Sequence, residues 1–307
     1  MRWTHGVALV LLVIAAVETA AQAPAAIPSN WPGFRGHDRA GVYAEPIRTT
    51  WDGLAPMWKK PIGGGRASFA IADGRAFTIE QRLQQEVVAA YNLMTGKELW
   101  TNAWQARFST WMGGGEGPRA TPTYADGHVY TLGGRGELRC LDAATGKVIW
   151  RINILDDTKA KNLRWGMAGS PLIAGDAVIV QPGGPAGRSV AAYDRRTGKR
   201  LWSALDDKTA YASPMQVTLL GVPQFLIVTA DRFLGLSVDR RQPRLLFLGL
   251  RRRRRRDRAD EGRREIRRPP GLAQHPHEES PVEFGPSRGL HLRSGRGDSR
   301  VPRCRDG

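Results

Sequence analysis

The apolar and polar positions between residues 58 and 247 follow the pattern of short strands. Runs of β-branched and aromatic residues last only a few positions and are interrupted by D-G or G-D pairs, which tight hairpins favour. No long stripe with the 3.6-residue period of a helix occurs in this range. The pattern predicts an all-β fold of consecutive antiparallel hairpins.

Three segments of this region superimpose without gaps. They read AYNLMTGKELW (90–100), CLDAATGKVIW (140–150) and AYDRRTGKRLW (192–202), and their final tryptophans are 50 and 52 residues apart. A hairpin-like segment precedes each of them, and a fourth such segment runs from 212 to 239. Self-similarity at this period predicts an array of repeated units, each with four short antiparallel strands.

The last turn of each unit carries residues that suit a tight hairpin. An Asn or Asp oxygen can accept backbone hydrogen bonds at the strand end, a threonine can close the same turn, and a glycine supplies the positive φ. The tryptophan that follows can bury its face against the next unit, and its indole N–H needs an acceptor. These expected structural positions are Asn92, Thr95, Gly96, Trp100, Asp142, Thr145, Gly146, Trp150, Asp194, Thr197, Gly198 and Trp202.

A four-stranded sheet of this size cannot bury both of its faces alone. Radial stacking of such sheets buries the faces and protects the edges, so we expect a β-propeller of four-stranded antiparallel blades. About four blades fit within 58–247, part of a propeller of seven or eight. A β-sandwich with similar hairpins is the alternative, and three ungapped copies of one turn motif favour the propeller.

The motif A-x-D-x-x-T-G-K-x-x-W resembles the tryptophan-docking motif of the PQQ-like, quinoprotein-type β-propeller repeat family. The segment Asn30–Gly36, with Arg39, Gly41 and Val42 after it, looks like the N-terminal signature of exported bacterial BamB-like members. The resemblance covers roughly residues 28–247. Because catalytic and non-catalytic propellers share the motif, it implies the fold and leaves the activity open.

The first 23 residues have the layout of a secretory signal peptide. Arg2 supplies a positive start, Val7–Val17 an apolar stretch, and Ala21–Ala23 a cleavage site, with Thr19–Ala21 equally suitable. About eleven apolar residues are too few for a bilayer, which needs about 20. We therefore expect a periplasmic or secreted protein without a transmembrane anchor after cleavage, with 24–57 as an N-terminal segment before the blades.

The formal net charge of +17 is unevenly distributed. Residues 240–307 carry 20 arginines, no lysine and 9 acidic residues, a net of +11, against +6 for residues 1–239. A basic tail could bind nucleic acid, but such arms usually include lysine and aromatic residues for stacking. This tail has no lysine, tryptophan or tyrosine. Nucleic-acid binding is therefore only the second alternative function.

An out-of-frame origin explains residues 248–307 better. Read one base later, the codons of 288–307 can encode EGYIYGLDEGILACLDAATG, which resembles DGHVYTLGGRGELRCLDAATG at 126–146. GC-rich codons in the wrong frame also yield an excess of arginine and proline. We interpret 248–307 as a tail produced by a frameshift, and resequencing the gene tests this directly.

The sequence supplies no candidate catalytic, cofactor-binding or metal-binding residue. The resemblance implies that catalytic members bind PQQ with Ca²⁺, often beside an adjacent cysteine pair. Ca²⁺ needs six to eight oxygens, and neither a cysteine pair nor a cluster of acidic and amide residues occurs here. The glycine runs 63–65 and 113–115 lack the G-K-[ST] ending of a phosphate loop. Three tryptophans outside the motif can either pack between blades or line a binding surface: Trp104, Trp111 and Trp165.

These observations favour an exported, non-catalytic propeller that serves as a binding scaffold for protein partners on one propeller face. The alternative function is a PQQ-dependent alcohol or sugar dehydrogenase, which would use PQQ with calcium. We expect no specific nucleic-acid partner.

Overall fold

A computed structural model describes residues 30–43, 46–47, 49–50, 53, 55–109, 115–219, 221–237 and 245–248. The expected signal peptide (1–23), the tail beyond Leu248 and Trp111 lie outside the described residues. Within the described ranges, no helix is long and apolar enough to cross a bilayer.

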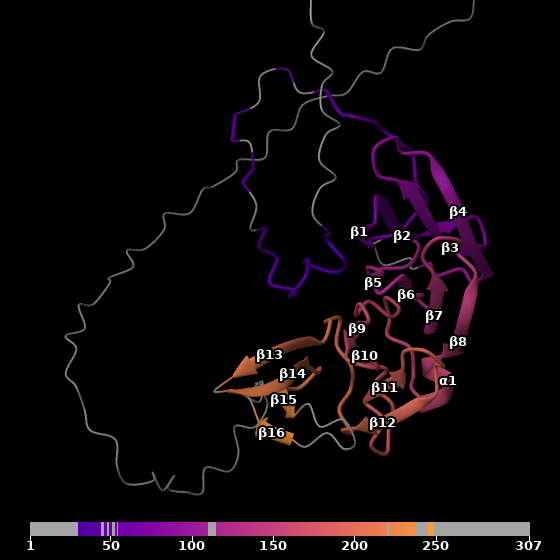
Figure 1. Ribbon diagram of the computed structural model, residues 1–307. Coiled ribbons are helices and arrows are strands. Elements are labelled where there is room, and N and C mark those ends of the chain that lie inside the picture. The colour runs from indigo at the N-terminus through magenta and orange to yellow at the C-terminus, as the bar shows by residue number, and fades with distance from the viewer. Residues whose placement is uncertain are drawn as a thin grey trace, which may run out of the picture. The chain divides into compact units, whose positions relative to one another are not determined.

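The described chain forms four antiparallel four-stranded sheets, each built from strands consecutive in sequence (Figure 1). This confirms the predicted all-β propeller fold of four-stranded antiparallel blades, four of which are described. Blade 1 contains β1 (Ala70–Ala72), β2 (Arg75–Arg82), β3 (Gln85–Asn92) and β4 (Glu98–Gln105); blade 2 contains β5 (Thr123–Ala125), β6 (His128–Leu132), β7 (Glu137–Asp142) and β8 (Val148–Asn153). Blade 3 contains β9 (Leu172–Ala174), β10 (Ala177–Val180), β11 (Val190–Asp194) and β12 (Arg200–Ala204); blade 4 contains β13 (Met215–Leu219), β14 (Val222–Val228), β15 (Phe233–Ser237) and β16 (Leu245–Leu248).

The D-G pairs form the first hairpin of blades 1 and 2. Asp73 and Gly74 have φ of 49° and 69°, and Asp126 and Gly127 have φ of 46° and 75°. Two consecutive residues with positive φ define the type I′ turn, whose twist matches that of the flanking strands. The D-G pair therefore fixes the register of β1 with β2 and of β5 with β6.

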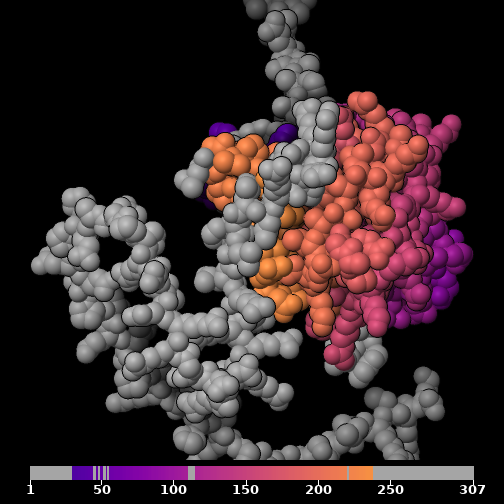
Figure 2. Space-filling model, turned by 90° about the horizontal axis from the view of Figure 1, so that it is seen from below, coloured from indigo at the N-terminus to yellow at the C-terminus, as the bar shows by residue number. Residues whose placement is uncertain are grey.

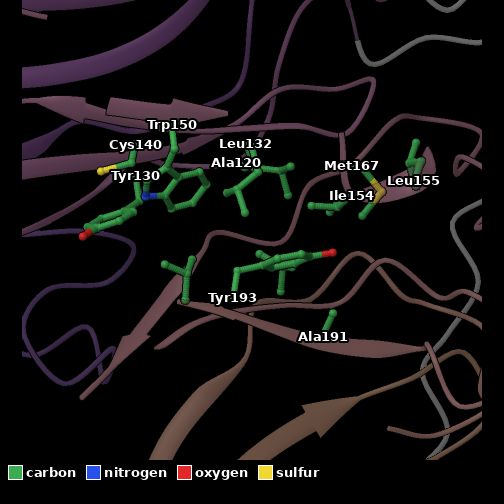
Figure 3. Packing of buried hydrophobic residues seen from close by; sticks show 13 residues of the cluster. Ala120, Tyr130, Leu132, Cys140, Trp150, Ile154, Leu155, Met167, Ala191 and Tyr193 are labelled. Atoms are coloured by element: carbon green, nitrogen blue, oxygen red, sulfur yellow. The ribbon is translucent and has the colours of Figure 1, made fainter. Parts of the chain in front are cut away.

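Each blade packs its apolar face on the next one. Between blades 2 and 3, the buried cluster includes Tyr130, Leu132, Trp150 and Tyr193 (Figure 3). Similar clusters join blade 1 to blade 2 and blade 3 to blade 4. Burial of one such side chain contributes about 1.5–3 kcal/mol, so these layers are the main source of stability. In the space-filling view the blades form a continuous surface from purple to orange (Figure 2).

A short helix, α1 (Ile154–Thr158), follows β8 and was not expected from the sequence. The Asn153 side chain caps it by accepting the backbone N–H groups of Leu155 (3.0 Å) and Asp156 (3.3 Å). Asp157 in this helix accepts the Tyr193 hydroxyl at 2.8 Å and pairs with Arg200 at 2.8 Å. The helix thus adds a polar connection between blades 2 and 3.

The N-terminal segment 30–43 lies along the first strands of the blades, which are called the innermost strands. Trp31 pairs with Ile71 of β1 through two backbone hydrogen bonds of 2.8 Å, and the Pro32 carbonyl accepts the Tyr124 N–H of β5 at 2.7 Å. Further along, the buried Arg39 guanidinium donates to the carbonyls of Ser170 (3.2 Å), Pro214 (2.8 Å) and Pro171, and to the Thr123 hydroxyl (3.4 Å). This segment therefore joins blades 1 to 4.

Candidate functional site

The Asn and Asp residues of the repeat motif lie in the turn before the outermost strand. Asn92 Oδ1 accepts the backbone N–H groups of Met94 (3.0 Å) and Thr95 (2.9 Å) and the Thr95 hydroxyl (3.0 Å). Asp142 with Thr145, and Asp194 with Thr197, repeat this arrangement. The hydrogen bonds from Thr145 hold the pKa of Asp142 below its usual value. The Oδ1 atom of each residue therefore serves as the acceptor that closes its own turn.

The motif tryptophans and glycines meet between consecutive blades. Trp100 Nε1 donates to the Ala143 carbonyl of blade 2 at 3.1 Å, and Trp150 Nε1 donates to the Arg195 carbonyl of blade 3 at 2.8 Å. Gly146 lies under the Trp100 ring, where an added Cβ would be 2.5 Å from Cε3. Gly198 lies in the same way under Trp150, with a corresponding distance of 2.7 Å.

A further tryptophan, Trp58, has the same environment on blade 1 and was missed by the sequence reasoning. Its Nε1 donates to the Leu93 carbonyl at 2.8 Å, and a Cβ on Gly96 would be 2.6 Å from its Cδ2. The T-G-K sequence is absent before Trp58, so the repeat search could not find it. Its position 42 residues before Trp100 was the available signal.

Trp202, the last tryptophan of the motif, packs within the cluster between blades 3 and 4. Its ring stacks on Phe225 at 6.4 Å between centroids and an interplanar angle of 28°. The turn between β15 and β16, where Gln242 and Pro243 replace T-G, lies outside the described residues.

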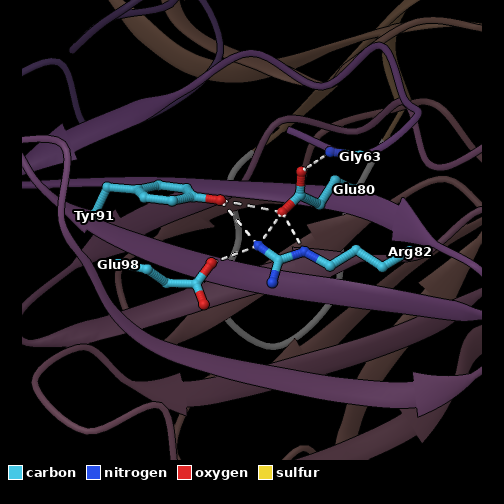
Figure 4. Close-up of polar contacts among 5 residues, drawn as sticks. All are labelled: Gly63, Glu80, Arg82, Tyr91 and Glu98. Carbon is cyan, nitrogen blue, oxygen red and sulfur yellow. Dashed lines mark hydrogen bonds and ion pairs between the residues drawn. The ribbon is translucent and has the colours of Figure 1, made fainter. Parts of the chain in front are cut away.

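A polar network lies on the face of blade 1 that points away from blade 2. Figure 4 shows its residues. Arg82 bridges Glu80 and Glu98, with 2.6 Å to Glu98 Oε2, and the Tyr91 hydroxyl donates to Glu80 Oε1 at 3.1 Å. Burial raises the pKa of Tyr91 to about 12, and the hydrogen bond from Arg82 lowers the pKa of Glu98. Each carboxylate is bound to the arginine, so the network is a structural ion-pair cluster and does not supply an acid–base pair.

Glu86, at the layer between blades 1 and 2, is a fully buried carboxyl group. Its Oε1 accepts the Gly134 N–H at 2.8 Å, and a Cβ on Gly133 would be 2.1 Å from its Oε2. Burial raises the pKa of Glu86 from the ordinary 4.5 to about 7, and the Gly134 N–H opposes this shift. Arg135 lowers the same pKa and Glu137 raises it.

We predict a pH-dependent effect of Glu86→Gln. Because the folded-state pKa lies above the unfolded one, wild-type stability falls as pH rises from about 4.5 to 7, by roughly 3 kcal/mol in total. The stability of the variant does not depend on pH in this way, because glutamine is neutral. The variant should therefore gain stability relative to wild type between pH 5 and pH 8. Thermal unfolding at both pH values measures the gain. Glu116→Gln, on an exposed glutamate, is the control, and an equal gain there would contradict the explanation.

One surface displays exposed aromatic rings beside arginines, at the links that lead into the innermost strands. Arg66, Arg119 and Tyr211 each lie four residues before the first residue of β1, β5 and β13, and Trp165 lies in the link before β9. These four residues are called the link surface. Trp165 is 38% exposed and Tyr211 44% exposed. Trp104, in contrast, packs against the core between blades 1 and 2.

Hydrogen bonds connect the members of the link surface. The Arg66 backbone N–H donates to the Pro118 carbonyl at 2.9 Å, next to Arg119. Arg119 Nε donates to the Trp165 carbonyl at 2.9 Å, and the Trp165 backbone N–H donates to the Tyr211 hydroxyl at 3.1 Å. The two rings are 5.3 Å apart between centroids. Four consecutive links therefore form one connected surface.

A groove of about 600 Å³ lies between the N-terminal segment and the first hairpin turns of blades 2 and 3. Its lining includes His37, Asp126, Asp176 and Arg195, and Asp126 pairs with Arg195 at 2.7 Å. Charges of both signs line the groove, so it selects no ligand charge.

The metal of quinoprotein dehydrogenases has no matching ligand set among the described residues, where no group of three or more His, Cys, Asp or Glu side chains gathers. Cys140 is buried, and burial raises its pKa to about 12, so it is not a ready nucleophile.

Each blade has four strands, and the tryptophan of one blade docks on the glycine turn of the next. This arrangement defines a PQQ-like β-propeller. The family model described as outer membrane protein assembly factor BamB matches residues 84–232. Residues 84–232 thus match the PQQ-like propeller repeat family, which confirms the resemblance drawn from the sequence.

Individual relatives are distant. The lanthanide-dependent methanol dehydrogenase of Methylacidiphilum fumariolicum (strain SolV) is 38% identical over 84 residues, 26% of this chain and 13% of that protein. Quinohemoprotein alcohol dehydrogenase from Comamonas testosteroni has a TM-score of 0.51 at 18% identity, over 72% of this chain and 41% of that chain. BamB from Moraxella catarrhalis has a TM-score of 0.41 at 18% identity, over 61% and 51%. The chain spans about half or less of these relatives, and the likeness to the alcohol dehydrogenase shows the fold alone.

Proposed function

We propose that this chain is an exported, non-catalytic PQQ-like propeller protein that acts as a binding module for a protein partner. The observation that carries the proposal is the link surface, where Trp165 and Tyr211 remain exposed beside Arg66 and Arg119. Exposed aromatic residues and arginines are enriched where proteins bind one another. The motif oxygens support a non-catalytic role because Asn92, Asp142 and Asp194 are used within their turns. Export rests on the signal-peptide pattern of residues 1–23.

Incubation of the full chain with PQQ and Ca²⁺, or with a lanthanide ion, tests the non-catalytic role. We expect no retention of PQQ after gel filtration and no dye reduction with primary alcohols or aldoses. A PQQ-dependent dye reduction would instead support the alternative dehydrogenase function.

A further inference from the structure

Arg66 and Arg119 lie on neighbouring links of the link surface, where the Arg66 backbone N–H donates to the Pro118 carbonyl beside Arg119. Arg119 donates from Nε to the Trp165 carbonyl at 2.9 Å and from Nη2 to the Gly115 carbonyl at 3.4 Å, so backbone groups orient its guanidinium. Burial lowers the pKa of Arg119, and the neighbouring charge of Arg66 lowers it further. A guanidinium forms charge-assisted hydrogen bonds with a carboxylate, so two arginines on neighbouring links favour an anionic ligand.

The aromatic pair lies directly beside these cations. Trp165 and Tyr211 are tilted by 48° with their rings in contact, and the Tyr211 hydroxyl accepts the Trp165 backbone N–H. The rings are therefore held in one arrangement although both are exposed. A fixed, exposed aromatic pair loses little conformational freedom when an apolar side chain packs on it.

We propose that the link surface binds an acidic segment of another protein, with carboxylates on Arg66 and Arg119 and an apolar or aromatic side chain on Trp165 and Tyr211. This inference rests on the proposed binding function and names its partner by chemistry. A peptide segment fits better than single-stranded nucleic acid, which stacks successive bases on open ring faces along a basic groove. Here the two rings pack against each other at an angle.

The test measures fluorescence anisotropy of a fluorescein-labelled peptide of alternating glutamate and phenylalanine, added to the full chain. We expect saturable binding that weakens about tenfold for Arg66→Glu and for Trp165→Ala. Arg196→Glu is the matched control, because Arg196 is exposed, lies in the β11–β12 turn at the opposite end of its sheet, and gives the same change of charge. Circular dichroism checks folding, and Tyr211→Ala replaces Trp165→Ala if that variant does not fold.

Several results would overturn the inference. If a peptide with glutamine in place of glutamate binds equally well, the surface does not recognise an anionic partner. The proposed binding function is not contradicted by that result. Unchanged affinity in Arg66→Glu and Trp165→Ala places the peptide elsewhere, and no binding at all rejects an acidic partner. Tighter binding of a single-stranded thymidine oligonucleotide assigns the surface to nucleic acid. Failure of the proposed function itself is recognised separately, by PQQ-dependent dye reduction.

Discussion

Arg39→Met should lower the free energy of unfolding by about 4 kcal/mol. The Arg39 guanidinium is buried and donates to three backbone carbonyls and to the Thr123 hydroxyl, so the variant removes four hydrogen bonds, and of these carbonyls that of Pro171 keeps the Thr123 hydroxyl as a donor. Each hydrogen bond from a charged donor contributes about 1.5–3 kcal/mol, and part of this is offset because burying the charge is itself costly. Burial lowers the pKa of Arg39 to about 10, so the group is charged at neutral pH. Urea denaturation followed by tryptophan fluorescence measures the loss.

Arg35→Met is the matched control for this prediction. Arg35 belongs to the same N-terminal segment, but it is exposed, and within the described residues its side chain donates to the nearby Ala40 carbonyl at 2.9 Å. We expect a loss of less than about 1 kcal/mol there. Arg39→Lys should lie between the two, because an ammonium group cannot match the fork of a guanidinium. Equal losses for Arg39→Met and Arg35→Met would show that the contacts of Arg39 do not join the blades.

Gly146→Ala should cost about 3 kcal/mol, and Gly127→Ala only about 1 kcal/mol. Both glycines have a similar positive φ, 73° and 75°, so both variants carry the same backbone strain of about 1 kcal/mol. Only at Gly146 would the new Cβ meet a ring, 2.5 Å from Trp100 Cε3, whereas nothing lies within 4 Å of a Cβ on Gly127. Displacing the ring costs about 2 kcal/mol more through lost packing and the lost bond to the Ala143 carbonyl.

Comparison of the two glycine variants isolates the contribution of tryptophan docking. Equilibrium urea denaturation of both proteins, with the same fluorescence signal, gives the difference. Equal destabilisation would mean that the backbone conformation alone explains why the motif has glycine at this position. Adding Trp100→Ala to Gly146→Ala should remove most of the difference, because the clash then no longer exists.

The repeat made the fold predictable, because D/N-x-x-T-G encodes a local turn in which the Asn or Asp oxygen accepts hydrogen bonds from the threonine three positions later. The same reasoning failed for Trp58, whose docking geometry equals that of Trp100 without the preceding motif. It also failed for α1, although Asn153 followed by Asp156 and Asp157 is a helix-start signal. Local patterns thus determine blades, while contacts between blades depend on distant partners.

The candidate site was only partly visible in the sequence. Trp165 was recognised as a tryptophan outside the motif, with two open interpretations, and the structure places it on the surface. Arg66, Arg119 and Tyr211 were missed, although the segments R-A-S, R-A-T and Y-A-S occur at equivalent positions before the innermost strands. Their proximity depends on the stacking of blades, which no single repeat contains.

The contacts of Arg39 have a consequence for the order of folding during translation. Pro214, one of its acceptors, is synthesised 175 residues after it. At 5–20 residues per second, the ribosome needs roughly 10 to 35 s for this stretch. The N-terminal segment can therefore pair with β1 early, whereas Arg39 completes its hydrogen bonds only after the chain has been made up to the start of blade 4.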